Sequence, residues 1–69
     1  MVKPITAQQL SILKIVAKHP GAEKEKLLAL AGVTEADLKY LEENDMIRER
    51  EAGRYRIAHF GELVLRRGN

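Results

Sequence analysis

Apolar residues recur at helical spacing through the first part of the chain and alternate with polar residues further on. Thr6 is of a type that caps helix N-termini, and the apolar positions after it are Leu10, Leu13, Val16 and Ala17. Proline and glycine stop helices, and the run His19-Pro20-Gly21 follows this stripe directly. The pattern therefore predicts a first helix near 6–18.

A second helix is predicted near 22–31, because acidic residues open this segment and leucines close it. Gly32 then stands where glycine commonly ends a helix. A third helix is predicted near 34–44, because Thr34 and Asp37 have the spacing of a capping box. Its core candidates are Leu38, Tyr40 and Leu41. Since a single residue separates Gly32 from Thr34, the two helices must meet at a sharp angle, as in a helix-turn-helix.

From Met46 onwards the period of the pattern changes from that of a helix to that of a strand. The alternation predicts strands near 46–50 and 54–58, joined by a tight turn in which Gly53 supplies a positive φ. In this arrangement Tyr55 and Ile57 face the helices. For the last stretch, near 61–67, a helical turn is favoured over a third strand.

These elements predict a mainly α fold with a small β-hairpin, consisting of three helices plus a two-stranded ribbon. A chain of 69 residues has room for one hydrophobic core, so residues 1–69 are expected to form a single domain. The 45% of hydrophobic residues is ordinary for a globular protein, and a net charge of +2 is too small to favour charge-driven disorder. Without cysteine, stability must come from packing of the helices and strands.

The stretch Leu38–Arg50 (LKYLEENDMIRER), followed by Gly53–Ile57 (GRYRI) and Gly61, resembles the winged helix-turn-helix family. The resemblance covers nearly the whole chain and implies a winged helix-turn-helix fold in which the ribbon is the wing. It also implies DNA binding in transcription regulation, although the same fold serves as a protein-interaction module. Two features depart from the family pattern. The third helix is short by about one turn, and Asp45 stands where the family has glycine.

Charged residues are segregated along the chain. Residues 1–33 carry five lysines and two glutamates, whereas residues 34–47, around the third helix, carry one lysine and five acidic residues. Residues 48–69 carry six arginines and three glutamates. Because DNA phosphates repel carboxylates, entry of the third helix into a major groove is not expected.

Four arginines alternate along the two predicted strands, so their side chains should project from one face: Arg48, Arg50, Arg54 and Arg56. A planar guanidinium group binds phosphate through two charge-assisted hydrogen bonds. The sequence therefore predicts a transcriptional regulator or accessory factor that docks on double-stranded DNA through a basic wing. Supporting contacts are expected from Lys24, Lys26 and Lys39. A solvated charged strand, with Glu49 or Glu51 pairing across it, is the simpler structural interpretation.

The acidic third helix suggests an alternative function, in which the domain is a protein-interaction module that receives a basic partner. The residues expected to bind that partner are Glu35, Lys39, Glu42, Glu43 and Asp45. A purely structural or self-associating domain is a third interpretation.

No catalytic chemistry is expected, because the chain has no glycine-rich phosphate loop, no nucleophile with a base, and no metal-ligand spacing. His19 and His59 are assigned structural roles, and we expect no enzyme, cofactor or metal. The chain has no signal-peptide pattern and no run of the roughly 20 apolar residues that span a bilayer. A cytoplasmic protein with no membrane contact is expected, associated with the nucleoid if it binds DNA.

The apolar tail bears on self-association. Its large apolar residues are Phe60, Leu63, Val64 and Leu65. Either they all pack on the first helix or some of them form an exposed contact patch. We expect a monomer or a weak homodimer.

Overall fold

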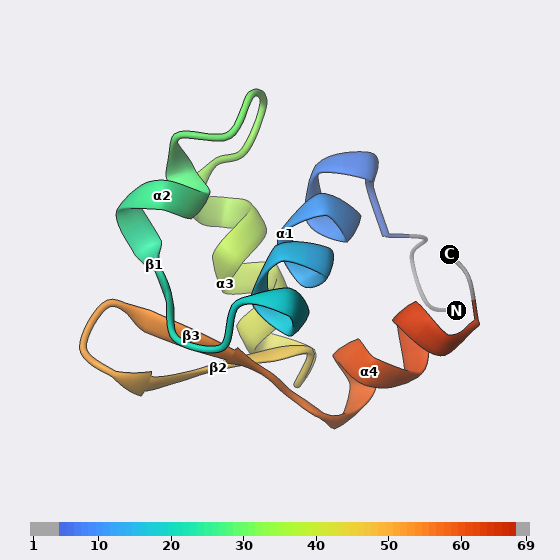
Figure 1. Ribbon diagram of the computed structural model, residues 1–69. Coiled ribbons are helices and arrows are strands. Elements are labelled where there is room, and N and C mark those ends of the chain that lie inside the picture. Colours follow the sequence, from blue (N-terminus) through green and yellow to red (C-terminus); the bar gives the residue numbers. More distant parts are fainter. Residues whose placement is uncertain (1–4, 68–69) are drawn as a thin grey trace.

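The computed structural model describes residues 5–67, which form four helices and a three-stranded antiparallel sheet. In chain order the elements are α1 (Ala7–Lys18), β1 (Ala22–Glu23), α2 (Lys24–Leu28), α3 (Glu35–Glu43), β2 (Ile47–Glu51), β3 (Arg54–Ile57) and α4 (His59–Arg66). Figure 1 shows α1, α2 and α3 on one side of the sheet, with α4 beside α1. Within residues 5–67 no helix is long and apolar enough to cross a membrane.

The sheet has the strand order β1-β3-β2, so the prediction of two strands was incomplete. Strand β1 takes up the start of the segment 22–31 that was predicted to be helical, and α2 also ends earlier than predicted, at Leu28. The backbone N–H of Gly21 donates to the carbonyl of Tyr55 at 2.9 Å, and that of Lys24 donates to the carbonyl of Gly53 at 2.7 Å. Pairing with a strand distant in sequence therefore overrides the local helical pattern.

Helix α1 begins behind a capping box. The Gln9 backbone N–H donates to the Thr6 hydroxyl, and the Thr6 N–H donates to Gln9 Oε1, both at 3.1 Å. Each hydrogen bond satisfies a backbone donor that the first turn would otherwise leave without a partner. The predicted start of this helix is therefore confirmed.

The buried stripe of α1 is rotated slightly from the predicted one. Leu13 and Val16 are buried as predicted, but Leu10 is half-buried, Ala17 is exposed, and Ile12 is fully buried in their place. Both sets of positions fit the period of a helix, so the sequence alone did not distinguish them.

Helix α3 agrees closely with the prediction. The Thr34 backbone N–H donates to the Asp37 carboxylate at 3.0 Å, as expected for the capping box, and Leu38 and Leu41 are buried. After the helix Asp45 adopts a φ of 58°, a left-handed conformation that aspartate tolerates better than most residues. This conformation turns the chain into β2.

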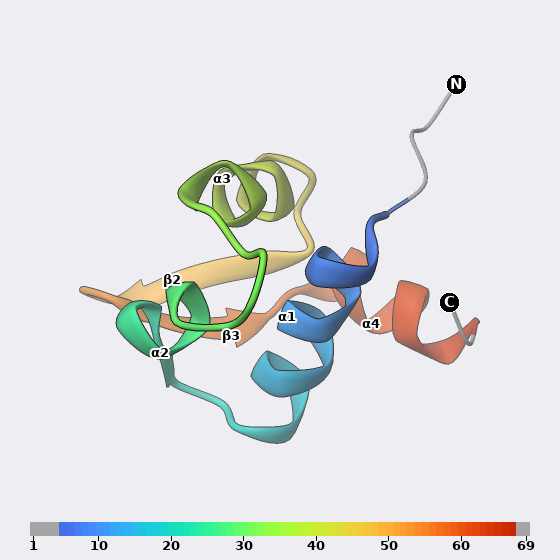
Figure 2. The ribbon, with the colours of Figure 1, turned by 90° about the horizontal axis from the view of Figure 1, so that it is seen from above.

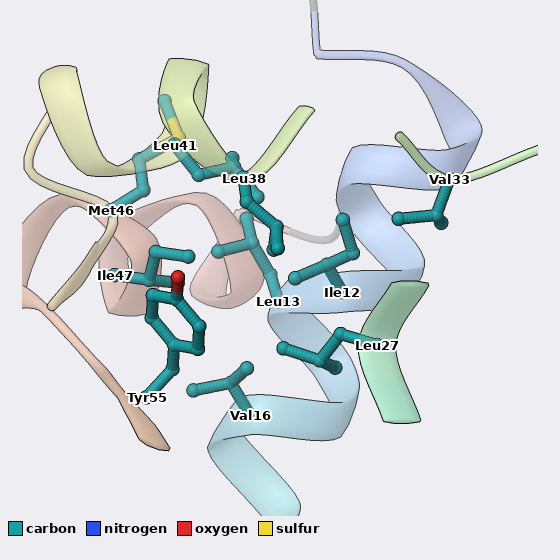
Figure 3. Close-up of a cluster of buried hydrophobic side chains, with 10 residues drawn as sticks. All are labelled: Ile12, Leu13, Val16, Leu27, Val33, Leu38, Leu41, Met46, Ile47 and Tyr55. Atoms are coloured by element: carbon teal, nitrogen blue, oxygen red, sulfur yellow. The ribbon is translucent and has the colours of Figure 1, made fainter. Parts of the chain in front are cut away.

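Strands β2 and β3 form the predicted hairpin. Gly53 in the connecting turn has a φ of 75°, as expected. Tyr55 is buried and Ile57 is half-buried against the core, so both face the helices as predicted. Figure 3 shows Tyr55 and Ile47 of the hairpin meeting Leu13 and Val16 of α1. The complete buried cluster comprises Ile12, Leu13, Val16, Leu27, Val33, Leu38, Leu41, Met46, Ile47 and Tyr55.

The C-terminal element is a continuous helix that begins earlier than the predicted turn at 61–67. Its apolar residues divide between two environments, because Val64 and Leu65 are half-buried against the core while Phe60 is 52% exposed. Seen from above in Figure 2, the hairpin passes beneath the helices, with α3 along one side and α1 along the other. This arrangement is compatible with a winged helix-turn-helix.

Candidate nucleic-acid interface

The hairpin brings arginines of β2 and β3 together on the side of the sheet that faces away from the helices. Arg48 and Arg56 are direct cross-strand partners, so their side chains leave the same face. Tyr55 points into the core with 1% of its surface exposed, and its neighbours Arg54 and Arg56 therefore point the other way. Helices α1, α2 and α3 lie on the opposite side (Figure 1). We call the surface formed by Arg48, Arg50, Arg54 and Arg56 the arginine face.

An irregularity in β2 alters the simple alternation along this strand. The register passes from Glu49↔Tyr55 to Glu51↔Arg54, so Arg50 is skipped. An open hollow of about 320 Å³ is lined by Arg50, Glu51, Arg54 and Arg56 together with Pro20 and Gly21. The bulge therefore keeps Arg50 beside the other arginines and also adds the Glu51 carboxylate, which alternation would place on the opposite face.

Two of the arginines make hydrogen bonds that orient their guanidinium groups. Arg48 donates to Asp45 Oδ1 from Nε at 3.2 Å and from Nη2 at 3.0 Å. Arg54 Nη1 donates to the Gly21 carbonyl at 3.3 Å. Over residues 5–67, the ion pairs of the structure include Arg48 but not the other three arginines. Most of the positive charge of the arginine face therefore has no carboxylate in contact with it.

The predicted supporting lysines do not line the hollow of the arginine face, although Lys24 and Lys26 each border another hollow with Arg54. Lys24 Nζ lies 3.1 Å from Glu35 of α3, and this hydrogen bond and charge raise the pKa of Lys24 above its usual range. Lys26 of α2 lies 3.9 Å from Glu23, and Lys39 is on α3. The structure therefore separates all three lysines from the hollow that Arg50, Arg54 and Arg56 line.

The acidic residues proposed for the alternative function are only partly together. Glu35, Glu42 and Glu43 are exposed on α3, and we call them the α3 carboxylates. Asp45 is bound to Arg48 and lies after the end of the helix. Lys39 borders the same hollow as Glu35 and Glu42. The structure therefore leaves a smaller acidic surface than the sequence suggested.

Tyr55 is a core residue that also borders the hollow beside α3. Its side chain borders the hollow that Lys39 and Glu42 line, beneath α3. Burial is the main factor that raises the pKa of Tyr55, and the charges of Glu42, Glu49 and Glu35 add to this effect. The hollow at Tyr55 holds Glu35 and Glu42 together with Lys24 and Lys39, whereas the hollow on the arginine side holds three arginines and Glu51.

Neither histidine belongs to a recognisable reactive group. His59 packs edge-on against Phe60 with their ring centroids 5.8 Å apart, and His19 follows the last residue of α1. Among residues 5–67 no group of three histidine or acidic residues is placed to hold a metal ion.

Pro20 and Gly21 were not predicted to lie beside the arginines, and Glu51 was predicted there only as a pairing residue of a solvated strand. Pro20 and Gly21 were interpreted only as a helix stop, and their place beside the hairpin follows from the pairing of β1 with β3. An extra residue in one strand was the signal for Glu51, but its position depends on the register, which the sequence did not fix. Comparison of the chain with protein-family models, with curated proteins and with solved structures found no match.

Proposed function

We propose that this chain is a small winged helix-turn-helix protein, a regulator or accessory factor, that binds the phosphate backbone of double-stranded DNA with its arginine face. The pairing of Arg48 directly opposite Arg56 is the observation that supports this proposal. Like charges in such a position destabilise a hairpin, and because Asp45 compensates only Arg48, the guanidinium group of Arg56 favours a role in binding an anion.

The hollow beside this pair has the chemistry that a phosphate requires. Arg50, Arg54 and Arg56 surround it, and each guanidinium group can offer a pair of charge-assisted hydrogen bonds. Contacts of this kind position a protein on DNA without reading bases. We therefore expect binding in the micromolar range that depends little on DNA sequence and strongly on salt.

Replacing both Arg54 and Arg56 with alanine tests this function. Both side chains are exposed, so the fold should persist. Fluorescence anisotropy with a labelled random-sequence duplex should show affinity lower by about tenfold at low salt. The slope of log affinity against log salt should also become shallower by about two, one unit for each lost phosphate contact.

The matched control is the double variant of Arg66 and Arg67 to alanine. These residues lie at the end of α4. Their replacement removes the same amount of charge from a surface outside the hairpin. Affinity should fall by less than about threefold, because screening weakens charges beyond about 8–10 Å. An equal loss in both double variants would show that only net charge matters, and an unchanged R54A/R56A affinity would refute docking through the arginine face.

The exposed α3 carboxylates support a second candidate function, binding of a basic protein partner. Replacing both Glu42 and Glu43 with lysine separates the two functions. The arginine face lies on the other side of the sheet, so duplex affinity should change by less than about threefold at physiological salt. A duplex that binds more than about tenfold tighter would instead place α3 against the DNA. Loss of binding to a labelled oligolysine peptide would support the partner-binding function.

A further inference from the structure

An apolar groove adjoins the arginine face at Arg54 and lies between the end of α1, strand β1 and helix α2. It has a volume of about 430 Å³, which is within the range of about 300–1,000 Å³ found for ligand pockets. Leu27 is buried at its floor, and Ile15, Ala22 and Leu30 are half-buried around it. The helices of the described chain therefore leave apolar side chains partly uncovered here.

The rim of this groove is mainly basic. Lys26 and Arg54 border it, and Glu23 is the carboxylate among its lining residues. The side chain of Lys26 is 82% exposed, and its 3.9 Å contact with Glu23 is long for an ion pair. Arg54 is held at the edge by its hydrogen bond to the Gly21 carbonyl. A bound molecule would therefore meet apolar walls and two cations.

We propose that this groove binds a peptide segment of a partner protein in which apolar side chains are flanked by aspartate or glutamate. The apolar side chains would cover Ile15 and Leu30, and the carboxylates would lie against Lys26 and Arg54. A nucleic acid fits this groove less well than an apolar peptide, because its walls are aliphatic and the aromatic ring among its lining residues is that of the exposed His19.

The groove and the arginine face share one residue, Arg54. A bound acidic segment would therefore occupy a guanidinium group that the proposed function assigns to DNA. The two ligands should compete, which would make DNA binding depend on the partner. The peptide site itself does not require DNA binding, because Ile15, Lys26 and Leu30 lie outside the arginine face.

The experiment is selection of a random peptide library displayed on phage against the intact protein, followed by titration of a synthetic peptide of the enriched sequence. Enriched sequences should combine apolar and acidic residues. In the nitrogen-15-labelled protein, the amide signals of Ile15, Ala22 and Leu30 should shift most. Lys26→Glu should lower the affinity for the peptide by about threefold to tenfold. Lys14→Glu, which changes charge equally on an exposed part of α1 outside the groove, should not weaken it.

Two further variants separate this inference from the proposed function. Arg50→Ala removes a side chain of the arginine face that does not border the groove. It should therefore weaken DNA binding and leave the affinity for the peptide unchanged. Leu30→Ser should weaken peptide binding and leave the affinity for DNA unchanged. The inference is overturned if no peptide is enriched, if the enriched peptides lack carboxylates, or if the shifted amides lie elsewhere. It is also overturned if these amides shift on self-association alone, because a second copy would then be the occupant.

Discussion

Replacing Gly61 with alanine is expected to lower the free energy of unfolding by about 2–3 kcal/mol. A Cβ at this position would collide with the Met46 carbonyl oxygen and would lie 2.7 Å from Ile57 Cδ1. The Met46 carbonyl cannot easily move aside, because it accepts a hydrogen bond of 2.9 Å from the Ala58 backbone N–H. The melting temperature, followed by circular dichroism, should fall by about 10–20 °C in a domain of this size.

The direction of this effect is informative because intrinsic helix propensity predicts the opposite. In an exposed helix, alanine is more favourable than glycine by about 0.8–1.0 kcal/mol. Glu62→Ala is the control, since Glu62 is the exposed neighbour of Gly61 in α4, and its effect should stay within about 0.5 kcal/mol. A Gly61→Ala variant as stable as the natural protein would show that α4 does not pack against the Met46 carbonyl in solution.

Gly61 illustrates which parts of the fold the sequence could predict. Local signals were sufficient where the physical cause was local, as at the Thr34 cap and the Gly53 turn. The sequence also marked Gly61 as part of the resemblance, but the need for glycine there comes from a close approach of α4 to the chain entering β2. Contacts between segments distant in sequence are not encoded by a local pattern.

Strand β1 was missed for the same reason. Ala22 and Glu23 begin a segment with the charge pattern of a helix start, and only the hydrogen bonds of their neighbours to β3 make them extended. The rotation of the α1 stripe is a different kind of error. It arose because Leu10 and Ile12 are both apolar and both have helical spacing to the stripe of Leu13 and Val16, on its opposite edges.

The geometry of the candidate site was likewise predicted only where its cause was local. Alternation along the strands was enough to place Arg48, Arg54 and Arg56 on one side of the hairpin, because that depends only on the strand period. The ion pairs Lys24–Glu35 and Arg48–Asp45 join different elements or depend on the geometry of a turn. These pairs decide how much charge remains available to a partner, and the sequence pattern did not predict them.

The proposed function depends on which side of the hairpin the arginines occupy. The arginine face points away from the helices. Glu49 lies on the other side of the hairpin, and its carboxylate accepts a hydrogen bond from the Gly53 backbone N–H. Helix α3 lies on the opposite side of the sheet from the arginine face, so a duplex docked on that face would meet guanidinium groups, with Glu51 beside them, away from the α3 carboxylates. Docking through the sheet therefore avoids the repulsion that excludes α3 from a groove.

At alkaline pH the free energy of unfolding is expected to fall because of Tyr55. Burial and the nearby carboxylates raise the pKa of Tyr55 in the folded protein above the value of 10.0 of an unperturbed tyrosine. Above pH 10 the tyrosine of the unfolded chain loses its proton while the folded one keeps it, so the unfolded state binds fewer protons. Stability must then decrease as pH rises, by at most about 1.4 kcal/mol per pH unit from this group.

Tyr55→Phe isolates this contribution, because it keeps the ring in the core and removes the ionisable hydroxyl. Urea unfolding of the natural protein and the variant should be compared between about pH 8 and pH 11.5, a range that crosses the tyrosine pKa of about 10. The natural protein should lose stability relative to the variant above pH 10, while lysine deprotonation cancels because both chains keep every lysine. Tyr40→Phe controls for removal of a half-buried hydroxyl from α3. A constant difference between Tyr55→Phe and the natural protein across this range would mean that water reaches the Tyr55 hydroxyl and that α3 does not close over it.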